Sequence, residues 1–555
     1  AAFFTNTPKQ DENQNHYLFY LFHFHPPIIH GDTPPPHPTE GCFSLFLRLG
    51  KISLYKLRRI VIIELLSFSP RFLIVLEQKI PFYYIKVRNV NAMEQGTAKL
   101  DMLHGSIWDK LLRFALPVAA TAALGQLFNA ADVAVVGNFA SGSRTAAVAA
   151  VGANGPIINL ILGLFIGIAL GATVVIANAI GNNDRKSAQN AVHTSLVMAV
   201  VGGVIVAIIG ELIAGSLLNL LQVPEDVYPL SLLYLRIYFL GMPAILLYNF
   251  EAAIFRSIGE TKVPLIALAA SGVLNVLLNL LFVIGFHMTV NGVAIATVLS
   301  NVVSSILLYR KLRKSDQYIH VEPQLLTIHW GSFRQIMRIG LPAGIQSAVF
   351  AISNIVIQSA INSLGTIVMA ASSAALNIEI IAYYVMNSFS QACATFVGQN
   401  YGAGQVKRCR KILGLCILED AIATASAIFI ILFAGKFVLA LFNPDPQVID
   451  IGYSRLLIVF TAYVFSMLYE VMSGYLRGFG ISLAPALLVI FGVCGIRILW
   501  ISFVFPVKRT FSTILYIYPI SLATTALLIG IALLVFRPSK RLAGQAQNAD
   551  SASAT

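Results

Sequence analysis

Between residues 110 and 536 the chain alternates long apolar stretches with short polar connections. Each stretch holds the roughly 20 mostly apolar residues that an α-helix needs to cross the ~30 Å hydrocarbon core of a bilayer. The pattern predicts about twelve such helices, over residues 110–138, 145–180, 187–221, 229–257, 262–286, 290–312, 333–362, 367–401, 408–442, 447–477, 482–506 and 511–536. The expected fold is an all-α polytopic membrane protein.

The composition supports this fold class and indicates which partners the protein has. Of the 555 residues 57% are hydrophobic and only 11% are charged, against ~25% charged residues in a soluble domain. The net charge of +13 comes from short basic clusters between apolar runs, which is the pattern of the positive-inside rule. The partners predicted are therefore the lipid bilayer and no nucleic acid. The expected location is the inner or plasma membrane, with both termini cytoplasmic.

Short segments of the first half recur in the second half. RFALP at residues 113–117 returns as RIGLP at 338–342, and FRSIGETKVP at 255–264 lines up with LRGFGISLAP at 476–485. Each unit holds an even number of spans, so the two copies run the same way across the membrane and are related by an axis along its normal. We expect an N-lobe over 93–312, a cytoplasmic loop over 313–332, a C-lobe over 333–536 and a disordered cytoplasmic tail over 537–555.

Residues 1–92 do not share this pattern. They contain no methionine, and their apolar runs are interrupted by charges. We interpret them as a non-native or disordered extension before Met93. A targeting segment is the alternative, although the stretch lacks a clear signal or transit pattern.

Polar groups inside the predicted spans are the candidates for chemistry. No HExxH, GxSxG or GxxxxGK[ST] motif occurs, so we predict no enzyme, no metal centre and no cofactor. Without an ATP site, uphill transport must use an ion gradient. Pro117, Pro243 and Pro342 are expected to kink or interrupt their helices, because proline lacks a backbone donor.

Asp132 is the strongest of these candidates. Gly125, Asn129 and Asp132 have helical spacing that places them on one face of the first span. A charged side chain at the bilayer centre costs about 2.5–3.5 kcal/mol, so it must face protein, water or an ion. Because an acid inside the membrane is functional by default, we favour an ion-linked site; a structural carboxylate bonded to a neighbouring helix is the alternative.

Glu379 is the second acid predicted to be functional, again with a structural ion pair as the alternative. Tyr383 and Met386 lie on the same helical face, and Asn275 and Asn279 share a face of another span. Any single amide could simply bond a neighbouring helix, which is worth ~0.6 kcal/mol on average. Our hypothesis is that these groups converge on a substrate cavity formed by Gln126, Asn154, Gln346, Asn354, Gln358, Glu379, Tyr383 and Met386.

Taken together, these motifs resemble the multidrug and toxic compound extrusion (MATE) family. The resemblance rests on the repeated Leu-Pro near the start of each half, ADVAVVG at 131–137, LNVLLN at 274–279 and FVGQNYGAG at 396–404. It covers residues 103–536. It implies two six-helix lobes around a central cavity, and export of amphipathic or cationic organic compounds in exchange for protons or sodium.

The resemblance also assigns roles to single residues. Asp132 matches the first-helix acid to which ion coupling is assigned in bacterial members, with Asn129 beside it, and sodium is a possible ligand there. Asn275 matches a fifth-helix asparagine, whereas Asn279 stands where many members have aspartate. Glu379 resembles an eighth-helix acid. The pattern is closer to the bacterial DNA-damage-inducible branch than to the sodium-linked branch, which favours protons.

The function expected is that of a monomeric secondary-active multidrug exporter, which works by alternating access. Two alternatives remain open at this stage. One is a lipid-linked-oligosaccharide flippase of the same superfamily, which would need a lipid-facing cationic groove. The other is a passive channel, which would show flux without coupling.

Overall fold

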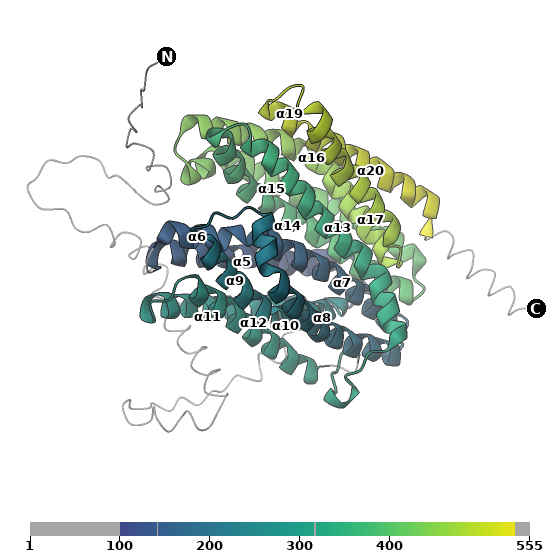
Figure 1. Cartoon of the computed structure of the whole chain (residues 1–555). Coiled ribbons are helices and arrows are strands. Elements are labelled where there is room, and N and C mark those ends of the chain that lie inside the picture. Colours follow the sequence, from purple (N-terminus) through teal and green to yellow (C-terminus); the bar gives the residue numbers. More distant parts are fainter. Residues whose placement is uncertain (1–99, 141–142, 316–317, 539–555) are drawn as a thin grey trace, which may run out of the picture. The chain divides into compact units, whose positions relative to one another are not determined.

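The computed structural model describes residues 100–140, 143–315 and 318–538. Every secondary-structure element within these ranges is helical (Figure 1). Residues 1–92, most of the predicted tail and parts of two connections lie outside the described residues, so the expectations for the extension and the tail are untested.

The first half of the chain forms the N-lobe. Its elements are α5 (Trp108–Phe139), α6 (Arg144–Ala153), α7 (Gly155–Gly181), α8 (Arg185–Leu220), α9 (Tyr228–Leu240), α10 (Met242–Ser257), α11 (Lys262–Leu280), the π-helical segment η1 (Leu281–Gly285) and α12 (Val290–Arg313).

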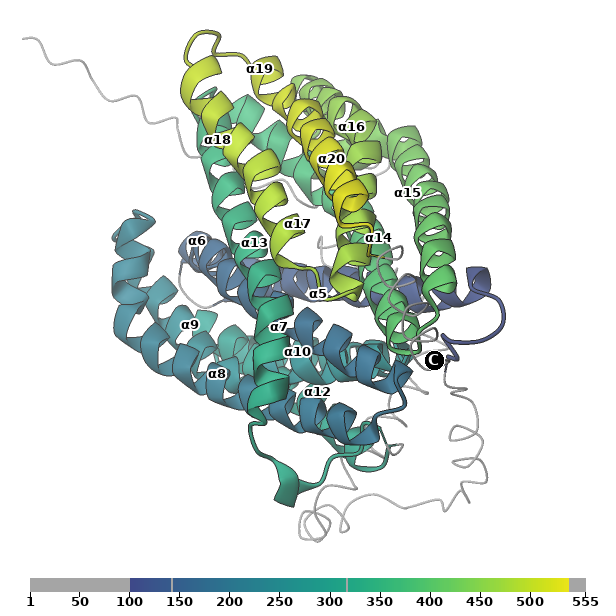
Figure 2. The same cartoon turned by 90° about the vertical axis from the view of Figure 1, so that its right-hand side faces the viewer.

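The second half forms the C-lobe, which follows a connection that contains the short 3₁₀ turn η2 (Pro323–Leu325). Its elements are α13 (Trp330–Asn362), α14 (Thr366–Gly402), α15 (Val406–Phe442), α16 (Pro446–Gly478), α17 (Leu483–Val489), η3 (Ile490–Gly495), α18 (Ile496–Leu499), η4 (Trp500–Val504), α19 (Phe511–Leu515) and α20 (Ile517–Phe536). Both η3 and η4 are π-helical. In Figure 2 the helices of the C-lobe lie mainly above those of the N-lobe, and α13 extends from the upper group onto the lower one.

The predicted spans agree with these helices. Among the described residues eleven helices are long and apolar enough to cross a membrane, and α9 with α10 makes a twelfth if this pair, bent by 52°, is one span. The bend lies at Gly241, where an added Cβ would come within 2.3 Å of Val298, and Pro243 follows in the first turn of α10. Helices α5 and α13 run through Pro117 and Pro342 without a break, in agreement with the single predicted spans 110–138 and 333–362.

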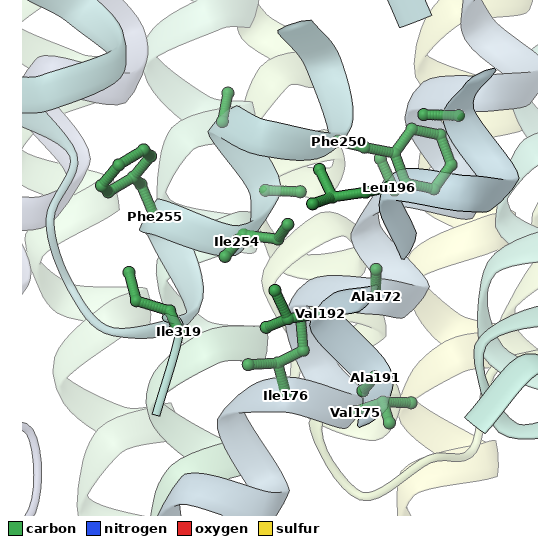
Figure 3. Close-up of a cluster of buried hydrophobic side chains, with 14 of the residues drawn as sticks. Ala172, Val175, Ile176, Ala191, Val192, Leu196, Phe250, Ile254, Phe255 and Ile319 are labelled. Atoms are coloured by element: carbon green, nitrogen blue, oxygen red, sulfur yellow. The ribbon is translucent and has the colours of Figure 1, made fainter. Parts of the chain in front are cut away.

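A buried apolar cluster fixes the N-lobe near its basic connections. Figure 3 shows side chains from α7, α8 and α10 meeting there, with Ile319 of the connection among them. Ile319 is fully buried. Two backbone amides of the connection also bind α8: Glu322 donates to His193 Nε2 at 3.1 Å, and His329 donates to Thr194 Oγ1 at 3.0 Å. The connection between the lobes is thus packed onto the N-lobe.

Glycines allow the two lobes to approach each other closely along α7. A Cβ added at Gly167 would lie 2.2 Å from the backbone nitrogen of Gly344 on α13. Nearer the basic connections, a Cβ at Gly181 would lie 1.9 Å from the Gln399 carbonyl oxygen, and one at Gly402 would lie 2.0 Å from the Asn178 carbonyl oxygen. The last two contacts are equivalent under the internal repeat. Residues 180–186 align with residues 401–407, so Gly181 in the N-lobe corresponds to Gly402 in the C-lobe.

Hydrogen bonds join the lobes in the same region. Gln399 Nε2 donates to the Ser257 carbonyl at 2.7 Å, and Asn400 Nδ2 donates to the Met102 carbonyl at 3.0 Å. Arg256 reaches across to Gln391 at 3.1 Å. These contacts hold the lobes together at the end that carries the basic connections.

Replacing Gly402 by alanine should destabilise the packing between the lobes. The new methyl would clash with backbone rather than with a flexible side chain, and overpacking of this kind costs about 1–3 kcal/mol. The matched control is Gly414→Ala on α15, where a Cβ meets no atom within 4 Å and better helix propensity should give no loss. We expect a lower apparent melting temperature in detergent only for Gly402→Ala; equal values for the two variants would contradict the close contact.

Candidate functional site

A polar cluster in the N-lobe surrounds Asp132 on α5. The side chain is 4% exposed, and two neutral groups from other helices hold it. Asn279 Nδ2 on α11 donates to Oδ1 at 2.6 Å, and Thr297 Oγ1 on α12 donates to Oδ2 at 3.1 Å. The carboxylate therefore links three helices of the lobe.

Asn275 positions the two donors. It lies one turn before Asn279 on α11, as the spacing predicted. Its Oδ1 accepts from Asn279 Nδ2 at 3.2 Å, and its Nδ2 donates to Thr297 Oγ1 at 3.3 Å. The Oδ1 atom of Asn279 is buried and has no hydrogen-bond partner among the described residues, which leaves an amide oxygen available beside the carboxylate. The π-helical segment η1 begins two residues later.

No positive side chain pairs with Asp132 among the described residues. The aromatic neighbours are Tyr234 and Tyr238 on α9, whose rings stack with centroids 6.1 Å apart and which interact electrostatically with the carboxylate. The negative charge of an ionised Asp132 is thus compensated only by hydrogen bonds, which is the setting in which a proton or a small cation binds.

Other residues predicted in the N-lobe lie elsewhere. Asn129 is exposed and donates to Gln126 Oε1 at 3.2 Å rather than to Asp132. Asn154 is fully buried and donates to the carbonyls of Ala150 and Ser231 at 2.8 and 3.1 Å. Asn154 therefore ties helices together, which is the ordinary role of an amide in a membrane bundle.

The C-lobe places Glu379 in a buried ion pair. Arg455 Nη2 on α16 lies 3.0 Å from Glu379 Oε2 on α14, and Tyr463 donates to Oε1 at 3.0 Å. Arg455 is 2% exposed; it also donates to Ser372 Oγ at 2.9 Å and to the Tyr518 hydroxyl at 3.3 Å. This network pairs both oxygens of the carboxylate and both Nη atoms of the guanidinium, so Glu379 resembles Asp132 in burial but not in charge balance.

A cavity of about 160 Å³ opens beside this pair. Three residues predicted for the substrate cavity line it: Asn354, Glu379 and Tyr383. The rest of its wall combines four aromatic side chains with aliphatic ones and carries an arginine other than Arg455. It consists of Phe350, Leu376, Ile380, Tyr463, Ser466, Tyr469, Arg497, Tyr518 and Leu522.

A smaller cavity of about 90 Å³ lies between the lobes and shares Tyr383 with the first. Gln346 lines it and accepts a hydrogen bond from Arg477 at 2.9 Å. Arg256 enters it from the N-lobe, and Glu470 lines the same wall as Arg477. The repeat relates Arg256 to Arg477, so this cavity receives one arginine from each lobe.

Two residues that were predicted to line the substrate cavity, Gln358 and Met386, line neither of the two cavities described above. Gln358 donates to Asn362 Oδ1 at 2.8 Å near the end of α13, and Met386 is fully buried. The predicted substrate set is therefore divided: some members line the two cavities, and others tie or fill the helix packing around them.

Sequence reasoning missed Thr297, Arg455 and Arg497. Arg455 and Arg497 lie within predicted spans, where an arginine is as costly as an acid, so the same argument that selected Asp132 could have selected them. Thr297 carries no comparable signal, because a threonine in a span usually bonds its own helix backbone.

Repeated halves, long apolar helices and a buried carboxylate without a counter-charge together define a membrane transporter. The family model MatE matches residues 117–281 and 342–501, one match in each lobe. The chain belongs to this family, which confirms the resemblance drawn from the motifs.

Known relatives agree with this placement. The chain is 26% identical over 407 residues to a probable multidrug resistance protein, YoeA, of Bacillus subtilis, covering 71% of this chain and 86% of the relative. It is 27% identical over 398 residues to a probable multidrug resistance protein, NorM, of Thermotoga maritima, covering 70% and 84%. Both relatives are named as probable multidrug resistance proteins, and the family places this chain among the integral membrane transporters.

The fold is also shared with a solved structure. An outward-facing multidrug resistance MATE family transporter superposes with a TM-score of 0.72 at 21% identity, over 80% of this chain and 99% of that one. This likeness concerns the fold, an all-α bundle in two parallel-repeat lobes.

A double-mutant cycle should show that Glu379 and Arg455 stabilise each other. Glu379→Gln or Arg455→Gln alone leaves a buried charge unpaired, so each should lower the free energy of unfolding by about 3–5 kcal/mol. The double variant should lose clearly less than the sum, as measured by equilibrium unfolding in detergent.

The exposed pair Lys436 and Asp450, 2.9 Å apart with both side chains more than half exposed, is the matched control. The coupling between these two residues should stay below about 1 kcal/mol. Additive effects of the Glu379 and Arg455 replacements would contradict the buried ion pair.

Proposed function

We propose that the protein is a secondary-active multidrug exporter of the plasma membrane. It exchanges amphipathic or cationic organic compounds for protons, or for sodium, by alternating access of the cavity between its lobes. Its termini are cytoplasmic, and the monomer is the working unit. The expectation of cationic substrates derives from the family resemblance, and Asp132 is the carboxylate that could attract them.

The observation that carries this proposal is the charge imbalance at Asp132. The side chain is buried and bonded only to the neutral groups of Asn279 and Thr297. An ionised carboxylate in such a place is costly, and binding a proton or a sodium ion removes that cost. Asn275 and Asn279 supply further amide oxygens nearby, which suit a hard cation.

Coupling follows from competition between two states. The lobes contact each other at the end with the basic connections, which the positive-inside rule assigns to the cytoplasm, so this conformation corresponds to one open outward. Ion binding at Asp132 changes the hydrogen bonds between α5, α11 and α12. An ion and a substrate that prefer different states then exchange across the membrane, each shifting the equilibrium by its differential affinity.

The two alternatives have less support. A flippase needs a cationic groove that faces lipid, but the large apolar groove of about 390 Å³ between α8, α10 and α12 is lined by no basic residue. A passive channel gives no reason for a buried carboxylate such as Asp132 that has no counter-charge. An uncoupled flux or a lipid substrate would nevertheless appear in the following experiment.

Asp132→Asn should abolish gradient-driven export and leave membrane insertion intact, because asparagine keeps the size of the side chain and one acceptor oxygen, carries no charge and takes up no proton. We would measure dye accumulation in inverted vesicles under a proton gradient and, separately, a sodium gradient. Rhodamine 123 and carboxyfluorescein serve as cationic and anionic reporters on one xanthene scaffold.

Glu211→Gln is the matched control, since Glu211 is an acid of α8 that pairs with Arg236 at 3.4 Å, away from the cluster. We expect this variant to keep wild-type accumulation. Accumulation driven by one gradient in the wild type names the coupling ion. Normal export by Asp132→Asn would overturn the proposal, and flux that ignores both gradients would favour the channel.

A further inference from the structure

Arg497 lies where the eleventh predicted span departs most from a regular α-helix. It belongs to α18, a single turn between the π-helical segments η3 and η4. Short π segments inside helices occur frequently at functional sites, because the extra residue displaces a side chain from its regular position. Here Gly492 permits a close approach to α20, with an added Cβ only 2.3 Å from Thr525.

The guanidinium group is held by a hydroxyl and by aromatic rings. Arg497 is 3% exposed, and its Nε donates to Ser521 Oγ at 3.2 Å. Its Cζ lies 4.6 Å from the ring centroid of Tyr518 and 5.6 Å from that of Phe350. These contacts orient the group while leaving its two Nη atoms without a protein acceptor among the described residues.

The charge of Arg497 has no counter-charge in the described part of the chain. No carboxylate lies within ion-pair distance of Arg497, whereas the neighbouring Arg455 is neutralised by Glu379 at 3.0 Å. The cavity wall therefore carries one uncompensated positive charge. The adjoining cavity, which shares Tyr383, adds two arginines, Arg256 and Arg477, against one acid, Glu470.

We propose that the C-lobe cavity is a binding subsite for aromatic organic anions, whose carboxylate or sulfonate pairs with the Nη atoms of Arg497. Arginine presents a planar fork of donors that matches a carboxylate in a bidentate pair. The aromatic walls formed by Phe350, Tyr383, Tyr469 and Tyr518 suit a flat ring. A volume of about 160 Å³ is close to that of a cavity that holds benzene, about 150 Å³. One ring therefore fits inside, and because the cavity is partly open, a second fused ring can extend through the opening.

This subsite names a substrate class for the transporter, and in that respect it rests on the proposed function. It is also distinct from the Asp132 cluster in sign and in lobe. A cationic ring would meet the unpaired guanidinium in the C-lobe cavity and would have to break the Glu379–Arg455 pair to find a carboxylate there.

Calorimetric titration of the purified full chain with three naphthalene probes tests the assignment. The probes share one ring system and differ in charge at pH 7.5: 1-naphthoate, 1-naphthalenemethanol and 1-naphthylmethylammonium. We expect the wild type to bind the anion at least tenfold more tightly than the other two. Arg497→Gln should weaken naphthoate binding at least tenfold and change naphthalenemethanol binding less than twofold, while Arg497→Lys should keep the preference for the anion.

Two further variants keep the test decisive even if Arg497→Gln does not fold. Asn354→Asp adds a negative charge to the same wall at nearly constant shape, and should reverse the charge preference. Arg236→Gln, which removes a positive charge outside both cavities, should bind all three probes like the wild type. Equal affinities of the three probes for the wild type, or an anion preference that survives both Arg497→Gln and Asn354→Asp, would overturn the assignment.

The outcome separates this inference from the proposed function. If naphthoate binding depends on Arg497 but no reporter moves under any gradient, the subsite stands and the exporter proposal fails. If gradient-driven export is present and depends on Asp132 while naphthoate binding ignores Arg497, the exporter stands and the subsite fails. Displacement of naphthoate by short-chain phosphatidylglycerol but not by benzoate would assign the guanidinium to a lipid headgroup and also overturn the subsite.

Discussion

A charge buried in a membrane bundle must be compensated, and this requirement organises both lobes. Glu379 is compensated permanently, because Arg455 and Tyr463 reach it from the same neighbouring helix. Asp132 has only amide and hydroxyl donors, so its balance depends on what arrives from solution. Arg497 poses the same problem with the opposite sign. Among the described residues, Asp132 in the N-lobe has no positive partner and Arg497 in the C-lobe has no negative partner, although the two lobes are copies of one repeat.

The two lobes share the positions that the internal repeat relates, but the side chains at these positions have different partners. Gly181 and Gly402 exchange equivalent contacts with the opposite lobe, and Arg256 and Arg477 enter the shared cavity from matching positions. The partners of the two arginines differ, however. Arg256 bonds Gln391 of the other lobe, whereas Arg477 bonds Gln346 of its own lobe. Backbone packing near the axis has kept its symmetry, while the polar side chains have diverged.

The architecture could be predicted because each of its determinants is local in sequence. Span length and basic connections are read within a window of about 20 residues, and the repeat is visible in RFALP and RIGLP. The face that carries Asn275 and Asn279 follows from helical periodicity alone. The bend between α9 and α10 was predicted from Pro243, and the single predicted span 110–138 agrees with the unbroken course of α5 through Pro117.

Partners of buried polar groups could not be predicted, because they depend on contacts between distant segments. Thr297 reaches Asp132 across 165 positions, and Arg455 reaches Glu379 across 76. Nothing local distinguishes Asn154, which ties helices together, from Asn354, which lines a cavity. Emphasis on acids and amides also left Arg455 and Arg497 unweighed, although the cost of an arginine in the membrane is comparable.

The packed connection between the lobes limits how the halves can move. Ile319 is inserted into the N-lobe, and the amide of His329 is bonded to α8 immediately before α13 begins at Trp330. Residues 319–329 of the connection are bound to the N-lobe in this way, so this part of the connection moves with the N-lobe. Any rocking of the C-lobe must then have its fulcrum in the first turns of α13, and the swing grows with distance from that point toward the ends of the helices that carry Asp132 and Glu379.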